Sequence, residues 1–158
     1  MDTTFFEWLQ STPPAVAVGE TWFPYVESAH VVFLAAVAGS ILMVDARLLG
    51  WASQHLRLSH VANRLLPVTW VAFIGAVITG GLMFIANPIT YIGNTPFLIK
   101  MVLLVMLGLN MLYFHLVTYR SVLLWDIGKP PPSARVAGFV STVLWISVVA
   151  FGRWIGFV

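Results

Sequence analysis

One stretch of the sequence decides the fold class: residues 25–49 read YVESAHVVFLAAVAGSILMVDARLL. A helix of this length crosses a membrane, because the hydrocarbon core requires roughly 20 apolar residues. Its charged and imidazole side chains are Glu27 and His30 near the start and Asp45 and Arg47 near the end. At about 100° per residue, Glu27 and Asp45 project in the same direction and His30 lies about 60° away. Ionisable groups inside a membrane are costly, so this face predicts a functional site.

The composition supports the same class. The chain has 158 residues, of which 59% are hydrophobic and 9% charged, and its mean hydropathy is +0.91. Soluble domains carry about 25% charged residues, so we expect an integral membrane protein forming one domain over residues 1–158. Cysteine is absent, which excludes disulfides and thiolate chemistry, and a net charge of +2 gives no indication of nucleic-acid binding. Acidic Asp2 and Glu7 at the start argue against a cleavable signal peptide.

Three further stretches are long and apolar enough to span: residues 67–86, 97–119 and 136–157. Turn chemistry bounds them, including Asn87-Pro88 and the proline-rich linker at 130–133. The predicted fold is therefore all-α, an integral membrane four-helix bundle. We also expect a short interfacial segment over residues 4–10 and an amphipathic helix over residues 51–66, in the first connection, before Pro67.

The distribution of cations predicts the orientation. Six of them surround the first and third connections: Arg47, Arg57, Arg64, Arg120, Lys129 and Arg135. Only Lys100 and Arg153 fall on the other side, where most of the acids also lie. By the positive-inside rule, both termini are outside and these two connections are cytoplasmic.

This orientation sorts the polar residues into two groups by depth. The outer group contains Glu27, His30, Lys100 and Arg153; the inner group contains Asp45, His55, His115 and the arginines of the connections. His30 and His115 differ in depth by roughly 20 Å, so they cannot both ligate one haem iron. On the inner side, His115 with His55 or His60 satisfies the depth requirement. On the outer side, His30 alone leaves a haem five-coordinate or ligated by something other than histidine.

Each of these residues also has a structural interpretation. Lys100 can snorkel to the interface, and Arg153 can pair with Glu27. We expect Asp45 to bond Arg120, Arg64 or His115, and Arg47 to reach the lipid headgroups. Asn110 lies mid-membrane, where an amide joins helices by hydrogen bonding. Small residues predict close helix approach or self-association: Gly75, Thr79, Gly80, Gly81, Gly152 and Gly156.

Several of these residues carry a resemblance. His30, the run Asp45-Ala-Arg-Leu-Leu-Gly50, Lys100, Asn110, Phe114-His115 and Gly152-Arg153 resemble a bacterial family of small four-helix membrane proteins without assigned function. More distantly, the chain is similar to the copper-resistance D (CopD) type of membrane domain and to b-type four-helix cytochromes. The resemblance implies a multi-pass protein of the bacterial inner (cytoplasmic) membrane whose polar ends handle haem or copper.

The leading hypothesis is a polar ligand site at the outer ends of spans one, three and four. Haem b would use His30 with Lys100 and Arg153, or His115 and His55 on the inner side. Copper would use His30 with methionine or Glu27. The alternative is a non-catalytic membrane subunit or scaffold without a cofactor, in which buried polar groups such as Asp45, Arg47 and Asn110 fix the packing. No catalytic motif indicates an enzyme. The expected partners are the lipid bilayer and a second copy or a redox membrane protein.

Overall fold

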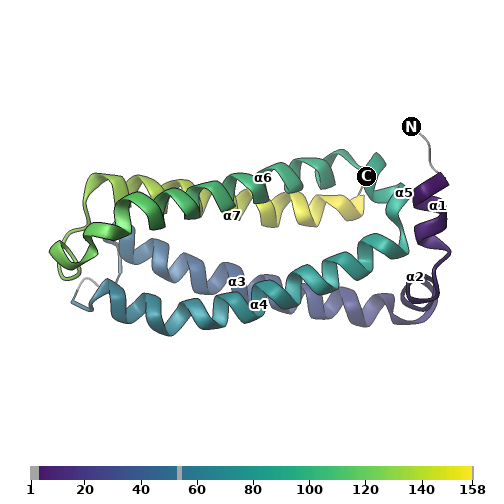
Figure 1. Cartoon of the computed structure of the whole chain (residues 1–158), viewed down its shortest axis with the longest axis horizontal. Helices are drawn as coiled ribbons and strands as arrows, with labels where there is room; N and C mark the ends of the chain where they lie inside the picture. The colour runs from purple at the N-terminus through teal and green to yellow at the C-terminus, as the bar shows by residue number, and fades with distance from the viewer. Residues whose placement is uncertain (1–3, 53–54, 158) are drawn as a thin grey trace.

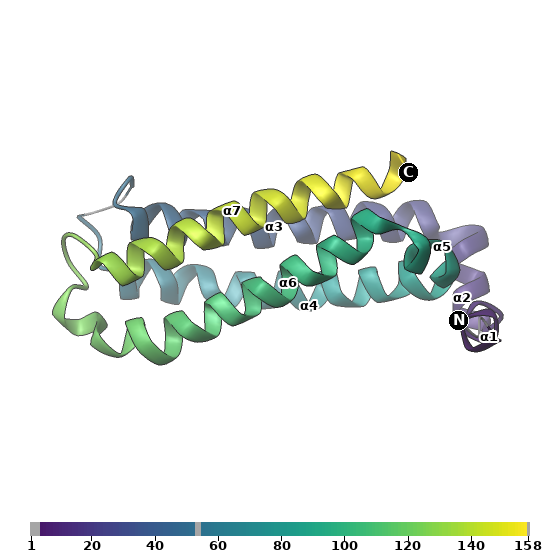
Figure 2. The same ribbon diagram turned by 90° about the horizontal axis from the view of Figure 1, so that it is seen from above.

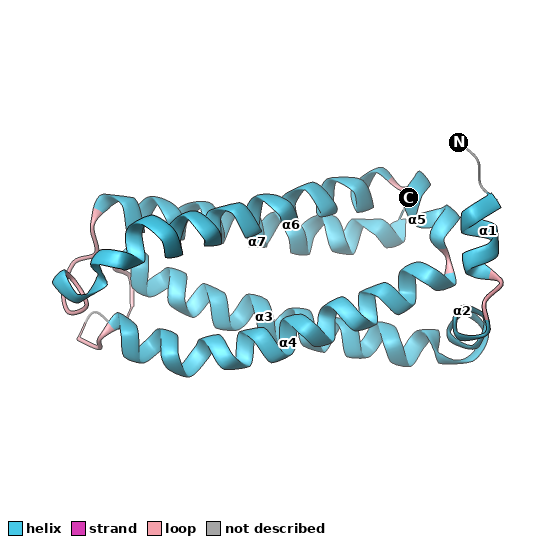
Figure 3. Cartoon of the chain, in the orientation of Figure 1, coloured by secondary structure: helices cyan, strands magenta, loops and turns pink. Residues whose placement is uncertain are grey.

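The computed structural model describes residues 4–52 and 55–157, and their regular structure is helical (Figures 1 and 3). The four long helices are α3 (Phe23–Leu49), α4 (Leu58–Ala86), α6 (Thr95–Tyr113) and α7 (Pro132–Trp154). The short helices are α1 (Thr4–Gln10), α2 (Pro13–Ala17) and α5 (Pro88–Gly93). Asp2, one of the acids that the sequence places outside, lies outside the described residues.

Turns of other helical types lengthen three of the long helices. A π-helical turn, Val18–Trp22, joins α2 to α3. A second one, Phe114–Thr118, and a 3-10 helix, Tyr119–Leu124, extend α6, while Ile155–Phe157 extends α7. In the described part of the chain, four stretches are long and apolar enough to cross a membrane: Pro13–Leu49, Leu58–Ala86, Thr95–Leu124 and Pro132–Phe157. The prediction of four apolar helices is confirmed, and each is longer than predicted.

The long helices form two antiparallel pairs stacked in layers (Figures 1 and 2). α3 packs along α4, α6 packs along α7, and the two pairs meet mainly where α7 packs on α3. α4 and α6 are joined by side chains, including the stacked rings of Phe84 and Phe97, whose centres are 5.8 Å apart. Both termini, α1, α2 and α5 lie at one end, which we name the terminal end (Figure 1). Residues 50–52 and 55–57 of the first connection and residues 125–131 of the third lie at the other end, which we name the basic end.

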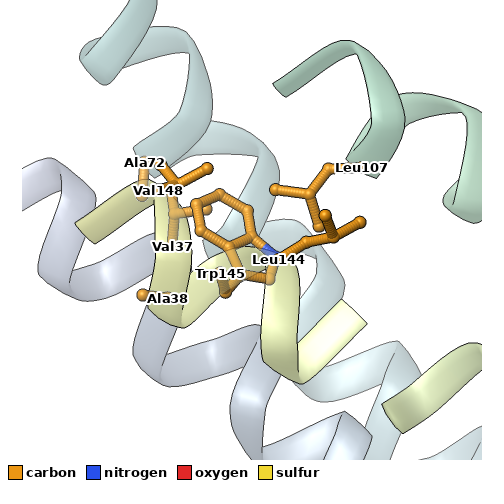
Figure 4. Packing of buried hydrophobic residues seen from close by; sticks show 7 residues of the cluster. All are labelled: Val37, Ala38, Ala72, Leu107, Leu144, Trp145 and Val148. Atoms are coloured by element: carbon orange, nitrogen blue, oxygen red, sulfur yellow. The ribbon is translucent and has the colours of Figure 1, made fainter. Parts of the chain in front are cut away.

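The core lies where α3, α4, α6 and α7 meet. Trp145 of α7 is its largest member and packs with Val37, Ala38, Ala72, Leu107, Leu144 and Val148 (Figure 4). Phe33 packs against this cluster and lies over Gly75 of α4, where an added Cβ would be 2.6 Å from the ring. Gly75 thus allows α3 to approach α4 closely, because it leaves room for the Phe33 ring.

The separate amphipathic helix predicted over residues 51–66 is wrong. Residues 58–66 are the first turns of α4, and Pro67 lies within that helix rather than before it. A proline removes one main-chain hydrogen bond and crowds the carbonyl four residues earlier, but neighbouring turns of a membrane helix can absorb both effects. Residues 51–52 and 55–57 form turns and irregular chain.

Candidate functional site at the terminal end

His30 of α3 is hydrogen-bonded to Thr79 of α4 at the terminal end. The imidazole Nδ1 lies 2.9 Å from the Thr79 hydroxyl oxygen, and that hydroxyl lies 2.7 Å from the Gly75 carbonyl oxygen. A hydroxyl has one hydrogen, and the carbonyl can only accept. The Thr79 hydroxyl therefore donates to Gly75 and accepts from His30 Nδ1–H. A neutral His30 then has its lone pair on Nε2.

Gly80 provides the space for this imidazole. A Cβ added at Gly80 would lie 3.0 Å from His30 Cε1, tighter than ordinary van der Waals contact. At the neighbouring Gly81 an added Cβ would meet nothing within 4 Å among the described residues. The close approach is therefore specific to the face of α4 that carries Thr79.

Lys100 of α6 extends toward the same end of the bundle. Its Nζ would lie 3.3 Å from a Cβ added at Gly152 of α7, so the side chain runs across α7 at a position without a side chain of its own. The ammonium is close enough to His30 for the two charges to interact. The structure thus brings His30 and Lys100 together, with Thr79 as a third member that the sequence did not single out for this role.

Glu27 and Arg153, also expected in this cluster, are exposed. They form no ion pair in the described ranges, and the Arg153 guanidinium instead lies 4.6 Å from the centre of the Phe157 ring. Glu27 acts on Tyr91 of α5: partial burial, and then the negative charge of Glu27, raise the pKa of the Tyr91 phenol. Of the four residues predicted to share one depth, His30 and Lys100 are therefore half-buried, whereas Glu27 and Arg153 lie on the surface.

The basic end is held by Arg47, the largest side chain there that is fully buried, with 0% of its surface exposed. Its guanidinium donates to the carbonyl oxygens of Leu56 (3.1 and 3.2 Å), Asp126 (3.2 Å) and Gly128 (3.2 Å). The expectation that Arg47 reaches the headgroups is wrong, because main-chain carbonyls of both connections surround it. We call this arrangement the arginine latch.

Asp126 completes the arginine latch from the third connection. Its carboxylate accepts from the Ser59 N–H and the Ser59 hydroxyl, both at 2.7 Å, and its carbonyl accepts from the Leu58 N–H at 3.0 Å. Burial alone would raise the pKa of this carboxyl, but the Ser59 hydrogen bonds and the charges of Arg57 and Arg47 outweigh it and hold the pKa below its usual value. Asp126 is not among the candidate residues that the sequence indicates.

Asp45 and Asn110 face α7. Asp45 is 4% exposed, lies near Ser141 and Thr142, and its Oδ2 has no hydrogen-bond partner among the described residues. The expected bonds to Arg120, Arg64 or His115 are not formed, since those side chains are exposed. Asn110 Nδ2 donates to the Ala137 carbonyl at 3.0 Å and joins α6 to α7.

The remaining histidines lie apart from His30. His55, His60 and His115 are all exposed, and His115 Nδ1 is hydrogen-bonded to the Met111 carbonyl of its own helix at 2.9 Å. No group of three or more His, Asp or Glu side chains in the described ranges is placed to hold a metal ion. Of the predicted site residues, the structure brings together only His30 and Lys100.

The role of Thr79 was accessible from the sequence in principle. His30 lies seven positions after the first residue of α3, and Thr79 lies seven positions before the last residue of α4. In an antiparallel helix pair, equal distances from the shared end place two residues at one depth. Exact helix ends were required for this inference, and the sequence did not supply them.

Four long apolar helices with polar residues at both ends define this chain as a small polytopic membrane protein. Residues 5–158 match the model of DUF6644, a family of unknown function, and the chain belongs to that family. No curated protein matches the chain, and no solved structure does.

Proposed function

We propose that the terminal end holds a ligand site with a single imidazole, His30, in a protein of the bacterial cytoplasmic membrane whose termini both lie outside. The observation that carries the proposal is the hydrogen bond from His30 Nδ1–H to Thr79. Metal-ligating histidines commonly donate one ring N–H to a second group, which fixes the ring and leaves the other nitrogen as the ligand. In His30, Nδ1–H makes the hydrogen bond to Thr79, so Nε2 is the ring nitrogen left to act as the ligand.

Haem b suits this set of donors better than copper does. The porphyrin supplies four of the iron ligands, so one imidazole is sufficient, whereas copper sites draw several nitrogen or sulfur donors from the protein. Glu27, the expected second copper ligand, is exposed. Lys100 supplies a half-buried cation near His30, which suits a haem propionate. Haem would supply one-electron redox chemistry, and these side chains would hold it.

Absorption spectra of the purified full chain test the proposal. After expression with haem precursor, we expect a Soret band, and an α band on reduction with dithionite. His30→Ala should remove both, and Lys100→Gln should weaken haem retention while keeping the band positions. His115→Ala is the matched control, because His115 is exposed and lies at the basic end. A chain without a Soret band after expression and reconstitution would overturn the haem proposal.

The second candidate is a membrane scaffold, and the same hydrogen bond favours it, because it joins α3 to α4. In this case His30→Ala lowers the thermal stability of the purified protein, and no variant changes a bound cofactor. The absorption spectra therefore distinguish the haem site from the scaffold, whereas the thermal stability of His30→Ala does not. A scaffold could also self-associate. The contact between copies would then use the faces of α4 and α6 that no other helix covers in the described ranges.

A further inference from the structure

Two leucines at the basic end are almost fully exposed. Leu123 and Leu124 end the 3-10 helix that extends α6, and 87% and 88% of their surfaces are exposed, the highest values for large apolar side chains in the described ranges. The helical stretch that they end, Thr95–Leu124, has 30 residues and is about 45 Å long, the thickness of a bilayer with its headgroups. A helix of this length that spans the bilayer would end, with these leucines, at the level of one membrane surface.

A cavity of about 230 Å³ lies beside them. It is lined by Arg57, which directly precedes α4, by Leu123 and Leu124, and by Asp126 and Ile127 of the third connection. The lining combines a cation, Arg57, and a carboxylate, Asp126, with the apolar side chains of two leucines and Ile127. This combination of surfaces is independent of the His30 site, which lies at the opposite end of the bundle.

The charged groups at this cavity are Arg57, the Asp126 carboxylate and the buried Arg47 beside it. The carboxylate accepts two hydrogen bonds of 2.7 Å from Ser59 and interacts with the charges of Arg57 and Arg47, so the two guanidinium groups carry one positive charge more than the carboxylate. Arg57 is exposed. Arg120 of the 3-10 helix and Lys129 of the third connection are exposed as well, so this end of the bundle carries further positive charge.

An occupant must match both walls. A free anion would satisfy Arg57 but leave Leu123, Leu124 and Ile127 in water, whereas a neutral lipid would cover the leucines and leave the guanidinium without an anion. An anionic phospholipid does both: its phosphate pairs with Arg57, and its glycerol and upper acyl chain cover the leucines. We infer that the cavity between Arg57 and Leu123–Leu124 is a binding site for one anionic phospholipid.

Native mass spectrometry of the full chain in a neutral detergent tests this inference. With equimolar phosphatidylglycerol and phosphatidylcholine, we expect one phosphatidylglycerol to be retained preferentially. Arg57→Gln should weaken that binding about fivefold, the effect expected from one cation near a membrane surface. Leu124→Ser should lower the retention as well. Arg135→Gln is the matched control, since Arg135 is an exposed arginine outside the cavity lining.

Three outcomes would overturn the inference. Equal retention of the two lipids would show that the site does not recognise an anion. An equal loss in Arg57→Gln and Arg135→Gln would show a diffuse attraction rather than a site. Thermal stabilisation by inorganic phosphate as large as that by phosphatidylglycerol would assign the site to a free anion. Each variant without added lipid should melt at the same temperature as the wild type, which establishes that it is folded.

Discussion

Arg47 and Asp126 join the two connections of the basic end through the main chain rather than through an ion pair. The Arg47 guanidinium donates to the Asp126 carbonyl at 3.2 Å, while the Asp126 carboxylate is directed to Ser59. Each residue thus fixes the backbone of a different segment. Arg47 holds residues 56, 126 and 128, and Asp126 holds the first turn of α4.

The first prediction concerns the guanidinium itself. Arg47→Leu removes the buried guanidinium that donates to three main-chain carbonyls, and we expect it to lower the free energy of unfolding by about 3 kcal/mol. Arg47→Lys should rescue only part of this loss, because an ammonium lacks the planar fork that reaches several acceptors. Unfolding in mixed detergent micelles measures both, with Arg135→Gln as the exposed control. Equal stability of Arg47→Leu and the control would refute the arginine latch.

The second prediction is a pH dependence. The pKa of Asp126 is lower in the folded chain than its usual value of about 3.9, so the unfolded chain binds more protons near that pH. The stabilisation is complete above about pH 5 and is lost as the pH falls through the lower, folded value. The difference in melting temperature between wild type and Asp126→Asn should therefore be constant from pH 7 to about 5 and shrink below about pH 4.

The other carboxyls are common to both chains and cancel in that difference. A gap that stays constant down to pH 3, or that widens on acidification, would contradict the assignment of the Ser59 and arginine contacts to the charged carboxylate.

The third prediction compares two adjacent glycines of α4. An alanine Cβ at Gly80 crowds the His30 imidazole at 3.0 Å, whereas one at Gly81 meets nothing within 4 Å in the described ranges. In a helix interior, glycine to alanine by itself stabilises by up to about 1 kcal/mol. We expect that gain for Gly81→Ala, and its loss or reversal for Gly80→Ala. Nitrogen chemical shifts of His30 should show the protonated Nδ1 in wild type and a changed environment only in Gly80→Ala.

The fourth prediction concerns orientation and uses the absence of cysteine from the sequence. Ser11 lies at the terminal end and Ser133 at the start of α7 near the basic end, and both are exposed. If both termini lie outside, a maleimide that cannot cross membranes labels Ser11→Cys in intact cells and labels Ser133→Cys only after permeabilisation. The reverse pattern would invert the proposed topology.

The four long helices were predictable because their signals are local: each is a long apolar run bounded by proline or asparagine. Pro67 shows where a local signal misleads. Alone, it indicates a helix boundary, but in α4 the flanking turns hold it inside a helix that starts nine residues earlier, at Leu58. The position of a helix boundary therefore depends on the turns that flank it, and these could not be located from the sequence alone.

The candidate site was predicted in part for a similar reason. Equal depth placed His30 and Lys100 at the same end of the bundle, since depth follows from counting along two helices. The surroundings of Arg47 could not be inferred in this way. Its partners are carbonyl oxygens of residues 56, 126 and 128, and every residue type carries a carbonyl. No side-chain pattern in the sequence marks them.

The arginine latch also orders events during synthesis. Arg47 and Gly128 are 81 positions apart, so a nascent chain that has inserted α3 and α4 still lacks two of the three carbonyl partners. Until α6 has crossed and the third connection has emerged, the first helix carries an arginine that can be solvated only at the membrane surface. Burial of Arg47 is therefore a late step, and an arginine that stays accessible marks a chain whose second pair of helices has not assembled.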